Sequence, residues 1–151
     1  MLRELYTRYV KTQLEQENKT VLILPHYETT DSLKMMLAAD NDNDNVMKKS
    51  NESLILMDSI KGLFGADDHM TFVSNLVNRA ENGVLVIADA GPFFHTSKND
   101  KLVEHELSMP SRFDVNLMRF CVFHKRDFDK LSKEEKKLII HHGQVLIIDD
   151  K

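Results

Sequence analysis

The sequence feature that most constrains the fold is the continuous apolar run Val84–Ala88, which follows Gly83 and leads into Asp89. Its apolar residues do not alternate with polar ones, as they would in a strand with one solvated face. A short run of this kind between turn residues predicts a strand buried on both faces, inside a parallel sheet. Because open α/β sheets bind ligands at the carboxyl ends of their strands, Asp89 marks the edge where we expect a site.

Strand and helix patterns alternate along the rest of the chain. Short apolar runs predict further strands at Val21–Leu24, Leu54–Met57, Asn116–Phe123 and Val145–Ile148. Helical patterns separate them, at 2–17, at 31–39, from 67 or 68 to a C′ residue at Gly83, at 99–109, and from a Ser132/Glu135 capping box to Gly143. This alternation predicts a three-layer α/β fold, in which helices cover both faces of a mostly parallel, Rossmann-like sheet of about five strands.

Length and composition predict a single domain over residues 1–151. A chain of 151 residues with 42% apolar content is long enough to bury a layered core. The segment Asp40–Asn51 departs from this composition, because D-N-D-N-D-N is polar and low in complexity, and we expect a flexible loop there. We also expect the connection Gly91–Ser97 to be a loop, since it begins with Gly-Pro.

Charge and cysteine content restrict the compartment and the partners. The net charge of −4 lacks the basic excess of nucleic-acid binders, so we expect no direct contact with nucleic acid. The single cysteine, Cys121, cannot form an internal disulfide, which favours a reducing compartment. No apolar run approaches the roughly 20 residues of a membrane helix, and the N-terminal M-L-R-E-L-Y-T-R-Y-V has no signal-peptide core. We therefore expect a cytoplasmic protein that does not contact a membrane.

The usual nucleotide-binding and phosphoacceptor motifs are absent. A phosphate loop needs glycines and a lysine after the first strand, where this chain has P-H-Y-E-T-T. The glycine pattern of dinucleotide-binding folds is missing as well. A phosphoacceptor domain would need an acidic pair after the first strand and a lysine after the last, and the chain has Pro25-His26 and Asp149-Asp150 there. We therefore expect no ATP hydrolysis by the usual machinery.

Histidines follow three of the predicted strands, at His26, His95 and His124. Three imidazoles together with Asp58 or Asp89 could satisfy a zinc ion. None of their spacings is a local ligand motif, however, and polar residues are ordinary at the rim of a sheet. We therefore expect neither a metal nor a cofactor.

Phenylalanines follow the central strand at the expected ligand edge, at Phe93 and Phe94. With Tyr27, Phe64 and Phe123 they could line an apolar pocket, since small-molecule sites are mostly apolar with a few placed polar groups. The alternative is that they only fill the space between a strand end and a helix. The sequence leaves these two interpretations open.

Six segments spread over nearly the whole chain carry a family resemblance, at 5–33, 54–65, 84–95, 103–110, 120–128 and 141–148. They include L-I-L-M-D-S-I-K-G-L-F-G, V-L-V-I-A-D-A-G-P-F-F-H and F-C-V-F-H-K-R-D-F. Together they resemble the MEDS family, the methanogen/methylotroph DcmR sensory domain, in a stand-alone variant of small archaeal proteins. The family's N-terminal H-x-x-x-x-Y segment has no counterpart before Leu2.

The resemblance implies a sensory module with a fold like that of the RecA and KaiC ATPases but without their phosphate loop. Family members are attached to histidine kinases or transcription regulators and sense small organic compounds. A RecA-like strand order would place the first strand between the third and the fourth, so that their loops converge on one crevice. The ligand-binding residues expected at this carboxyl edge of the sheet are His26, Tyr27, Glu28, Asp58, Asp89, Phe93, Phe94, His95 and His124.

The leading functional hypothesis is a non-enzymatic sensory domain that binds a small organic molecule. It would act in signal transduction or transcriptional regulation through a kinase, a transcription regulator or a second copy of itself. The alternative is a metal- or histidine-dependent hydrolase or phosphotransfer enzyme that uses His26, Asp89, His95 and His124. A third possibility is an interaction module that oligomerises through an exposed helix face.

Overall fold

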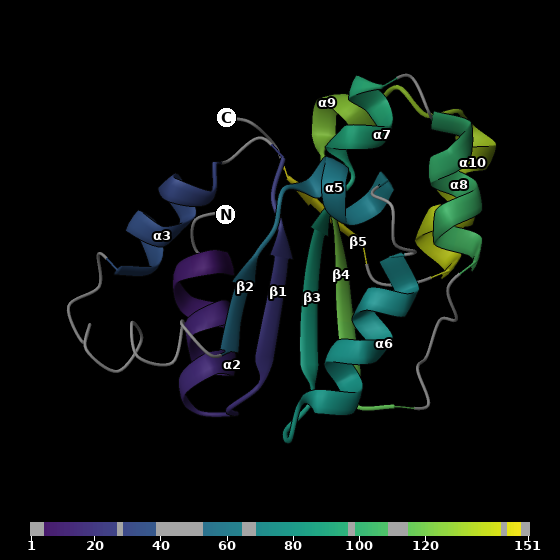
Figure 1. The fold of residues 1–151 in the computed structure, drawn as a ribbon. Helices are drawn as coiled ribbons and strands as arrows, with labels where there is room; N and C mark the ends of the chain where they lie inside the picture. Colours follow the sequence, from purple (N-terminus) through teal and green to yellow (C-terminus); the bar gives the residue numbers. More distant parts are fainter. Residues whose placement is uncertain are drawn as a thin grey trace.

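The strand that the sequence places at the centre, β3 (Val84–Asp89), lies inside a parallel sheet. The structure, a computed structural model, describes residues 5–26, 29–38, 53–64, 69–96, 99–108, 115–142 and 145–148. Five strands form one sheet in the order β2-β1-β3-β4-β5, and every neighbouring pair is parallel (Figure 1). The other strands are β1 (Thr20–Leu24), β2 (Leu54–Leu56), β4 (Leu117–His124) and β5 (Val145–Ile148). The predicted α/β fold with a parallel sheet is confirmed.

The strand order differs from the RecA-like order that the family resemblance implies. β1 lies between β2 and β3, not between the third and fourth strands. The chain therefore steps from β1 out to β2, crosses back to β3 on the other side of β1, and continues outward to β5. This reversal makes a topological switch point between β1 and β3, which is where open α/β sheets place their ligands. The RecA-like order came from the resemblance alone, and the apolar pattern of a strand could not have corrected it, because that pattern reflects burial and does not identify the neighbouring strands.

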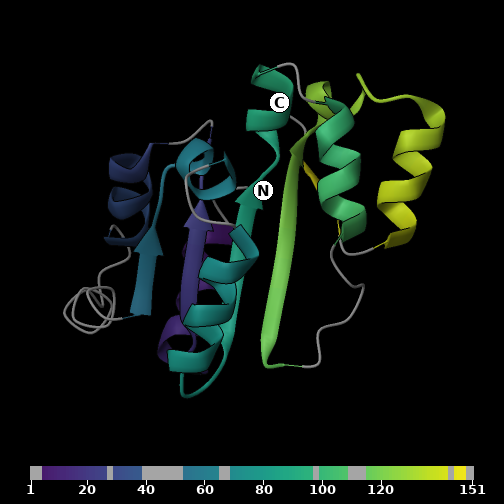
Figure 2. The ribbon, with the colours of Figure 1, turned by 45° about the vertical axis from the view of Figure 1, so that its right-hand side comes forward.

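Helices cover both faces of the sheet, as predicted. The π-helix η1 (Leu5–Val10), α2 (Lys11–Glu15) and α3 (Thr30–Ala38) lie on one face. The opposite face carries α5 (Ser59–Phe64), α6 (His69–Arg79), α8 (Asn99–Ser108) and α10 (Lys133–His142), and Figure 2 shows α6 in front of the strands and α2 behind them. Crossover connections between parallel strands are right-handed. The chain moves along the sheet in one direction from β1 to β2 and in the opposite direction from β2 to β5, so the helices after β2 lie on the opposite face from α3.

Alternate residues of the inner strands pack into different halves of the core. In β1, Val21 and Ile23 pack with Leu14 and Leu33 on one face, whereas Leu22 belongs to the core of the other face. The residues of β3 are all buried. This two-sided burial explains why the strand sequences are continuous apolar runs without polar alternation.

The short helix α7 (Gly91–His95) occupies a segment that we expected to be a loop, and α9 (Lys125–Phe128) lies where the sequence predicted no element. Pro92 lies in the first turn of α7, where its fixed φ and missing N–H suit a helix start. α5 was also missed between the second strand and the helix predicted from 67 or 68. Figure 1 shows α7 and α9 at the end of the sheet to which the strand arrows point.

The predicted capping box of α10 is confirmed, and α3 has a side-chain cap as well. In α10, Glu135 donates its N–H to Ser132 Oγ at 3.1 Å, and Ser132 donates its N–H to Glu135 Oε1 at 2.9 Å. Thr29 caps α3 by accepting the N–H of Ser32 at 3.0 Å. The predicted loop Asp40–Asn51 and the predicted stop at Gly143 lie outside the described residues. None of the helices in the described part of the chain combines the length and the apolar character of a membrane span.

Gly83 serves the strand that follows it and not the helix before it. α6 already ends at Arg79, so the prediction of Gly83 as its C′ residue is wrong. Gly83 has a φ of +95°, a left-handed conformation that favours glycine, and it directly precedes β3. A Cβ atom placed here would lie 2.5 Å from the side chain of Asn116, which directly precedes β4.

We predict that Gly83→Ala lowers the free energy of unfolding by about 1–3 kcal/mol, because alanine is strained at positive φ. Urea unfolding followed by circular dichroism would measure the loss. The double variant Gly83→Ala/Asn116→Ala removes the steric contact and should recover only part of the stability, because the backbone strain remains. Full recovery would show that the steric contact, and not the conformation, requires glycine.

Candidate functional site

Polar side chains from successive strand ends gather at the carboxyl edge of the sheet, around the switch point. His26 follows β1, and Asp58 follows β2. Asp89 ends β3 and His124 ends β4. His95 reaches the same edge from the last residue of α7, since its ring lies 5.2 Å from that of His26. Four of the predicted residues, His26, Asp89, His95 and His124, therefore lie at one edge of the sheet, although the strand order that brings them there is different.

Asp89 joins three elements at this edge. Its Oδ1 accepts the N–H of Gly91 at 2.7 Å, which fixes the first turn of α7. Its Oδ2 accepts a hydrogen bond from His124 Nε2 at 3.1 Å, and both side chains are buried. A buried carboxylate is stable only when its oxygens are hydrogen-bonded, and these contacts involve both of them. Asp89 and His124 thus hold the ends of β3 and β4 and the start of α7 together.

His26 lies beside this pair, half-buried, at the switch point between β1 and β3. Its ring meets that of His95 edge-on, and its Nδ1 lies 3.4 Å from the hydroxyl of Ser59. Burial lowers the pKa of His26 below its usual value, and the neighbouring His95 acts in the same direction. The carboxylates of Asp89, Asp127 and Asp58 oppose this shift, with a smaller effect on the pKa than burial has.

The sequence analysis missed Asp127 and Ser59. Asp127 is buried in α9 and pairs with Lys130 Nζ at 3.1 Å, close enough to the site to act on His26. Ser59 is 1% exposed at the start of α5. The segment H-K-R-D-F offered one signal for Asp127, since it places a carboxylate three residues after a strand end. The burial of that carboxylate depends on α9, which the sequence did not predict.

The remaining predicted site residues do not join the histidines. Phe93 is buried and packs into the core, with its ring 5.0 Å from Phe64 and 5.3 Å from His105. Phe94 is half-buried against the same core cluster. These contacts agree with the space-filling interpretation of the phenylalanines. Tyr27 and Glu28 lie outside the described residues.

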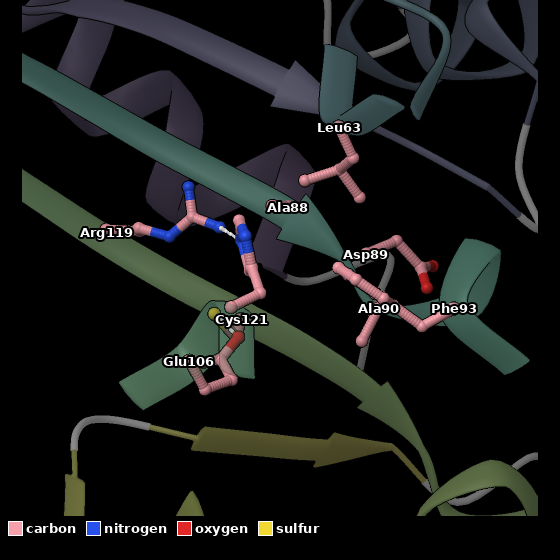
Figure 3. A pocket seen from close by; sticks show the side chains of 9 residues that line it. Leu63, Ala88, Asp89, Ala90, Phe93, Glu106, Arg119 and Cys121 are labelled. Atoms are coloured by element: carbon pink, nitrogen blue, oxygen red, sulfur yellow. Dashed lines mark hydrogen bonds between the residues drawn. The ribbon is translucent and has the colours of Figure 1, made fainter. Parts of the chain in front are cut away.

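A second group of polar side chains, Arg119, Cys121, His105 and Glu106, lies beneath the carboxyl edge of the sheet. A partly open cavity lies between the sheet, α5, α7 and α8, and its gaps, about 170 Å³ in all with the solvent at its opening included, are too narrow to hold a water molecule. Figure 3 shows Arg119 and Cys121 of β4 at one side of it and Asp89 at the other, with the carboxylate of Asp89 turned away from Arg119. Its lining residues are Leu63, Ala88, Asp89, Ala90, Phe93, His105, Glu106, Arg119 and Cys121.

The cysteine of this second group is not reactive. Burial raises the pKa of the Cys121 thiol to about 12, and the thiol donates a hydrogen bond to Glu106 at 2.8 Å. A thiol of this kind is not a nucleophile at neutral pH. Within the described ranges, no three histidine, cysteine, aspartate or glutamate side chains are placed to hold a metal ion.

Comparison with family models, with curated proteins and with solved structures finds no match to this chain. The resemblance to the MEDS family is therefore unsupported by these comparisons. What the structure shows is the α/β fold with its all-parallel sheet and the polar cluster at the switch point.

We predict that Asp89→Ala lowers the free energy of unfolding by about 2–5 kcal/mol, because it leaves the Gly91 N–H and the buried His124 ring without their acceptor. Asp89→Asn keeps one carbonyl oxygen for the Gly91 N–H and should lose less, about 1–2 kcal/mol. Urea unfolding at pH 7 would measure both variants. Equal losses would show that the hydrogen bond to His124, which both variants lose, carries the stability, and that the hydrogen bond to the Gly91 N–H contributes little.

We also predict that the imidazole of His26 titrates below its usual value of 6.5, as its lowered pKa requires. The unfolded chain then binds this proton more tightly than the folded chain does. The contribution of His26 to stability is therefore complete above pH 6.5 and is lost as the pH falls from 6.5 toward the folded pKa. An NMR titration, with His26→Asn to assign the signal, would measure the midpoint. A midpoint at or above 6.5 would contradict the burial of this ring.

Proposed function

We propose that this chain is a non-enzymatic sensory domain that binds a small organic molecule at the switch point between β1 and β3. His26 and His95 would contact the ligand, and Asp58 and the loop after β1 would complete the site. Binding would be passed on to a protein partner in signal transduction or transcriptional regulation. The domain would act in the cytoplasm, without direct contact to nucleic acid.

The observation that carries this proposal is the pair of imidazoles that meet across the switch point, 5.2 Å apart. One ring is half-buried and the other is exposed, so both can reach a molecule at the edge of the sheet. Imidazoles offer a flat apolar surface together with a hydrogen-bonding nitrogen, and a small organic ligand needs both. The switch point is also the place where sheets of this order bind their ligands.

The burial of Asp89 and His124 favours a binding site over a catalytic site. A general acid or base must lie within hydrogen-bonding reach of the substrate. Asp89 and His124 are only 3% and 5% exposed and are hydrogen-bonded to each other, which leaves little of either side chain within reach of a substrate. Such a pair makes a rigid platform behind His26 and His95, which is what a preorganised binding site requires.

The sensory role comes from the resemblance of the sequence to the MEDS family, whose members act through kinases or transcription regulators. Exposed apolar side chains support a protein partner or a second copy of the chain. Leu138 and Ile140 of α10 and Leu107 of α8 are each more than 40% exposed, on two helices that pack together. Exposed apolar groups of this kind are typical of interaction surfaces when they are adjacent.

We predict that the freshly purified protein retains a small organic molecule in native mass spectrometry. The variant His26→Ala/His95→Ala should lose roughly tenfold or more in occupancy, because it removes two hydrogen-bonding rings. The matched control is Lys34→Ala, at an exposed position of α3 on the other face of the sheet, and it should keep the wild-type occupancy.

Other outcomes would replace the proposal. A stoichiometric metal ion, measured on the same sample, would favour the metal- or histidine-dependent enzyme. An organic molecule retained equally by all three proteins would place the ligand elsewhere. An empty wild-type protein that forms stable oligomers would favour an interaction module.

A further inference from the structure

Arg119 is a charged residue in the middle of an apolar strand, and two histidines hold it. Its side chain shares a face of β4 with Cys121 and lies under the helices that cover β4. One terminal nitrogen contacts His69 Nε2 of α6, and the other lies 3.1 Å from His105 Nε2 of α8. The rings of His69 and His105 are 5.7 Å apart, so the guanidinium bridges two helices that are distant in sequence.

The chemistry of arginine fixes the protonation of both histidines. A guanidinium only donates hydrogen bonds, so each Nε2 must present a lone pair to it. Both rings are then neutral, with their proton on Nδ1. His69 fits this assignment, because its Nδ1 lies 3.0 Å from the carbonyl oxygen of Gly62 in α5, an atom that only accepts. The resulting chain of hydrogen bonds runs from Gly62 through His69 and Arg119 to His105.

The other charged and titratable groups around this chain are few among the described residues. Glu106 of α8 lies beside Cys121, whose thiol is neutral because burial raises its pKa to about 12. Asp89 lines the same cavity, but its carboxylate is turned toward His124 and away from Arg119 (Figure 3). α5 and α7 contribute a carbonyl and apolar side chains, including Leu63 and Phe93. Glu106 would favour an additional proton on the histidines, whereas the direct contacts with Arg119 oppose it.

We propose that Arg119, His69 and His105 form a proton-sensitive clamp, which holds α6 and α8 on β4 while both histidines are neutral and releases them when either is protonated. A proton on Nε2 removes the acceptor of an Arg119 hydrogen bond and places an N–H against another N–H. It also places two positive charges in contact where little water can screen them, since His69 is only 5% exposed.

Release of the clamp would alter the carboxyl edge of the sheet, because α5 contacts both the clamp and His26. His69 is bonded to Gly62 of this helix, and Ser59 at its start lies beside His26. α5 also contributes Leu63 to the narrow cavity. Acidification would thus loosen the helices around the cavity and displace a neighbour of His26. The clamp itself does not depend on the ligand proposed above, and it can be tested without one.

We expect the unfolding equilibrium constant of the wild type to rise roughly tenfold for each clamp histidine between pH 7.5 and 5.5, beyond what the rest of the chain contributes. Each ring takes up a proton on unfolding, with an ordinary pKa of about 6.5 in the unfolded chain. In His69→Gln/His105→Gln, amide oxygens can accept from Arg119 but do not titrate, so this part of the pH dependence should vanish. Urea unfolding at several pH values would measure it.

The matched control places glutamine at exposed positions of the same two helices, in Asn78→Gln/Lys101→Gln, and should keep the wild-type pH dependence. A direct reading comes from ¹⁵N NMR of the wild-type imidazoles at pH 7.5, which should show protons on Nδ1 of His69 and His105. A cationic ring, a proton on Nε2, or an unchanged pH dependence in the His69→Gln/His105→Gln variant would overturn the clamp.

Discussion

The burial of β3 on both faces is the constraint on which the rest of the structure depends. Helices cover each face of this strand, so its side chains are unavailable to a ligand along its length. Chemistry can occur only where the strand ends, and Asp89 stands there. Because Asp89 is buried as well, its oxygens need donors, and Gly91 and His124 supply them. The same carboxylate therefore ends the strand, starts α7 and joins β3 to β4, which gives the candidate site a rigid floor.

Features that depend on neighbouring residues could be predicted from the sequence, and features that depend on distant ones could not. The continuous apolar runs identified the strands, and the Ser132/Glu135 pair identified the start of α10. The strand order implied by the family resemblance is wrong. The local sequence could not have corrected it, because parallel strands carry no local record of their partners. The histidines of the site were found because each follows a predicted strand. Asp127 was missed because its burial depends on α9, a four-residue helix with too few residues to show a period.

Arg119 illustrates a different limit of sequence reasoning. An arginine between Met118 and Phe120 interrupts an apolar strand, and such an interruption is a signal in itself. Its meaning depends on His69 and His105, which approach from two helices and lie 50 and 14 residues away in the sequence. A partly buried charge is destabilising unless hydrogen bonds compensate for it, and the acceptors at the terminal nitrogens of Arg119 are neutral rings instead of a carboxylate. Only the folded structure shows that Nε2 of each histidine must stay unprotonated, because it accepts a hydrogen bond from Arg119.

Protonation is disfavoured both at His26 and at the clamp histidines, His69 and His105, but for different physical reasons. At His26 the charged form is disfavoured because burial removes water from the ring. At His69 and His105 it is disfavoured because Arg119 occupies the lone pair that a proton would need. The first effect weakens if the edge of the sheet opens to solvent, whereas the second persists as long as β4 and the two helices stay packed. Since Gly62 and Ser59 of α5 contact the two groups, a proton taken up at the clamp changes the surroundings of His26 even when His26 itself stays neutral.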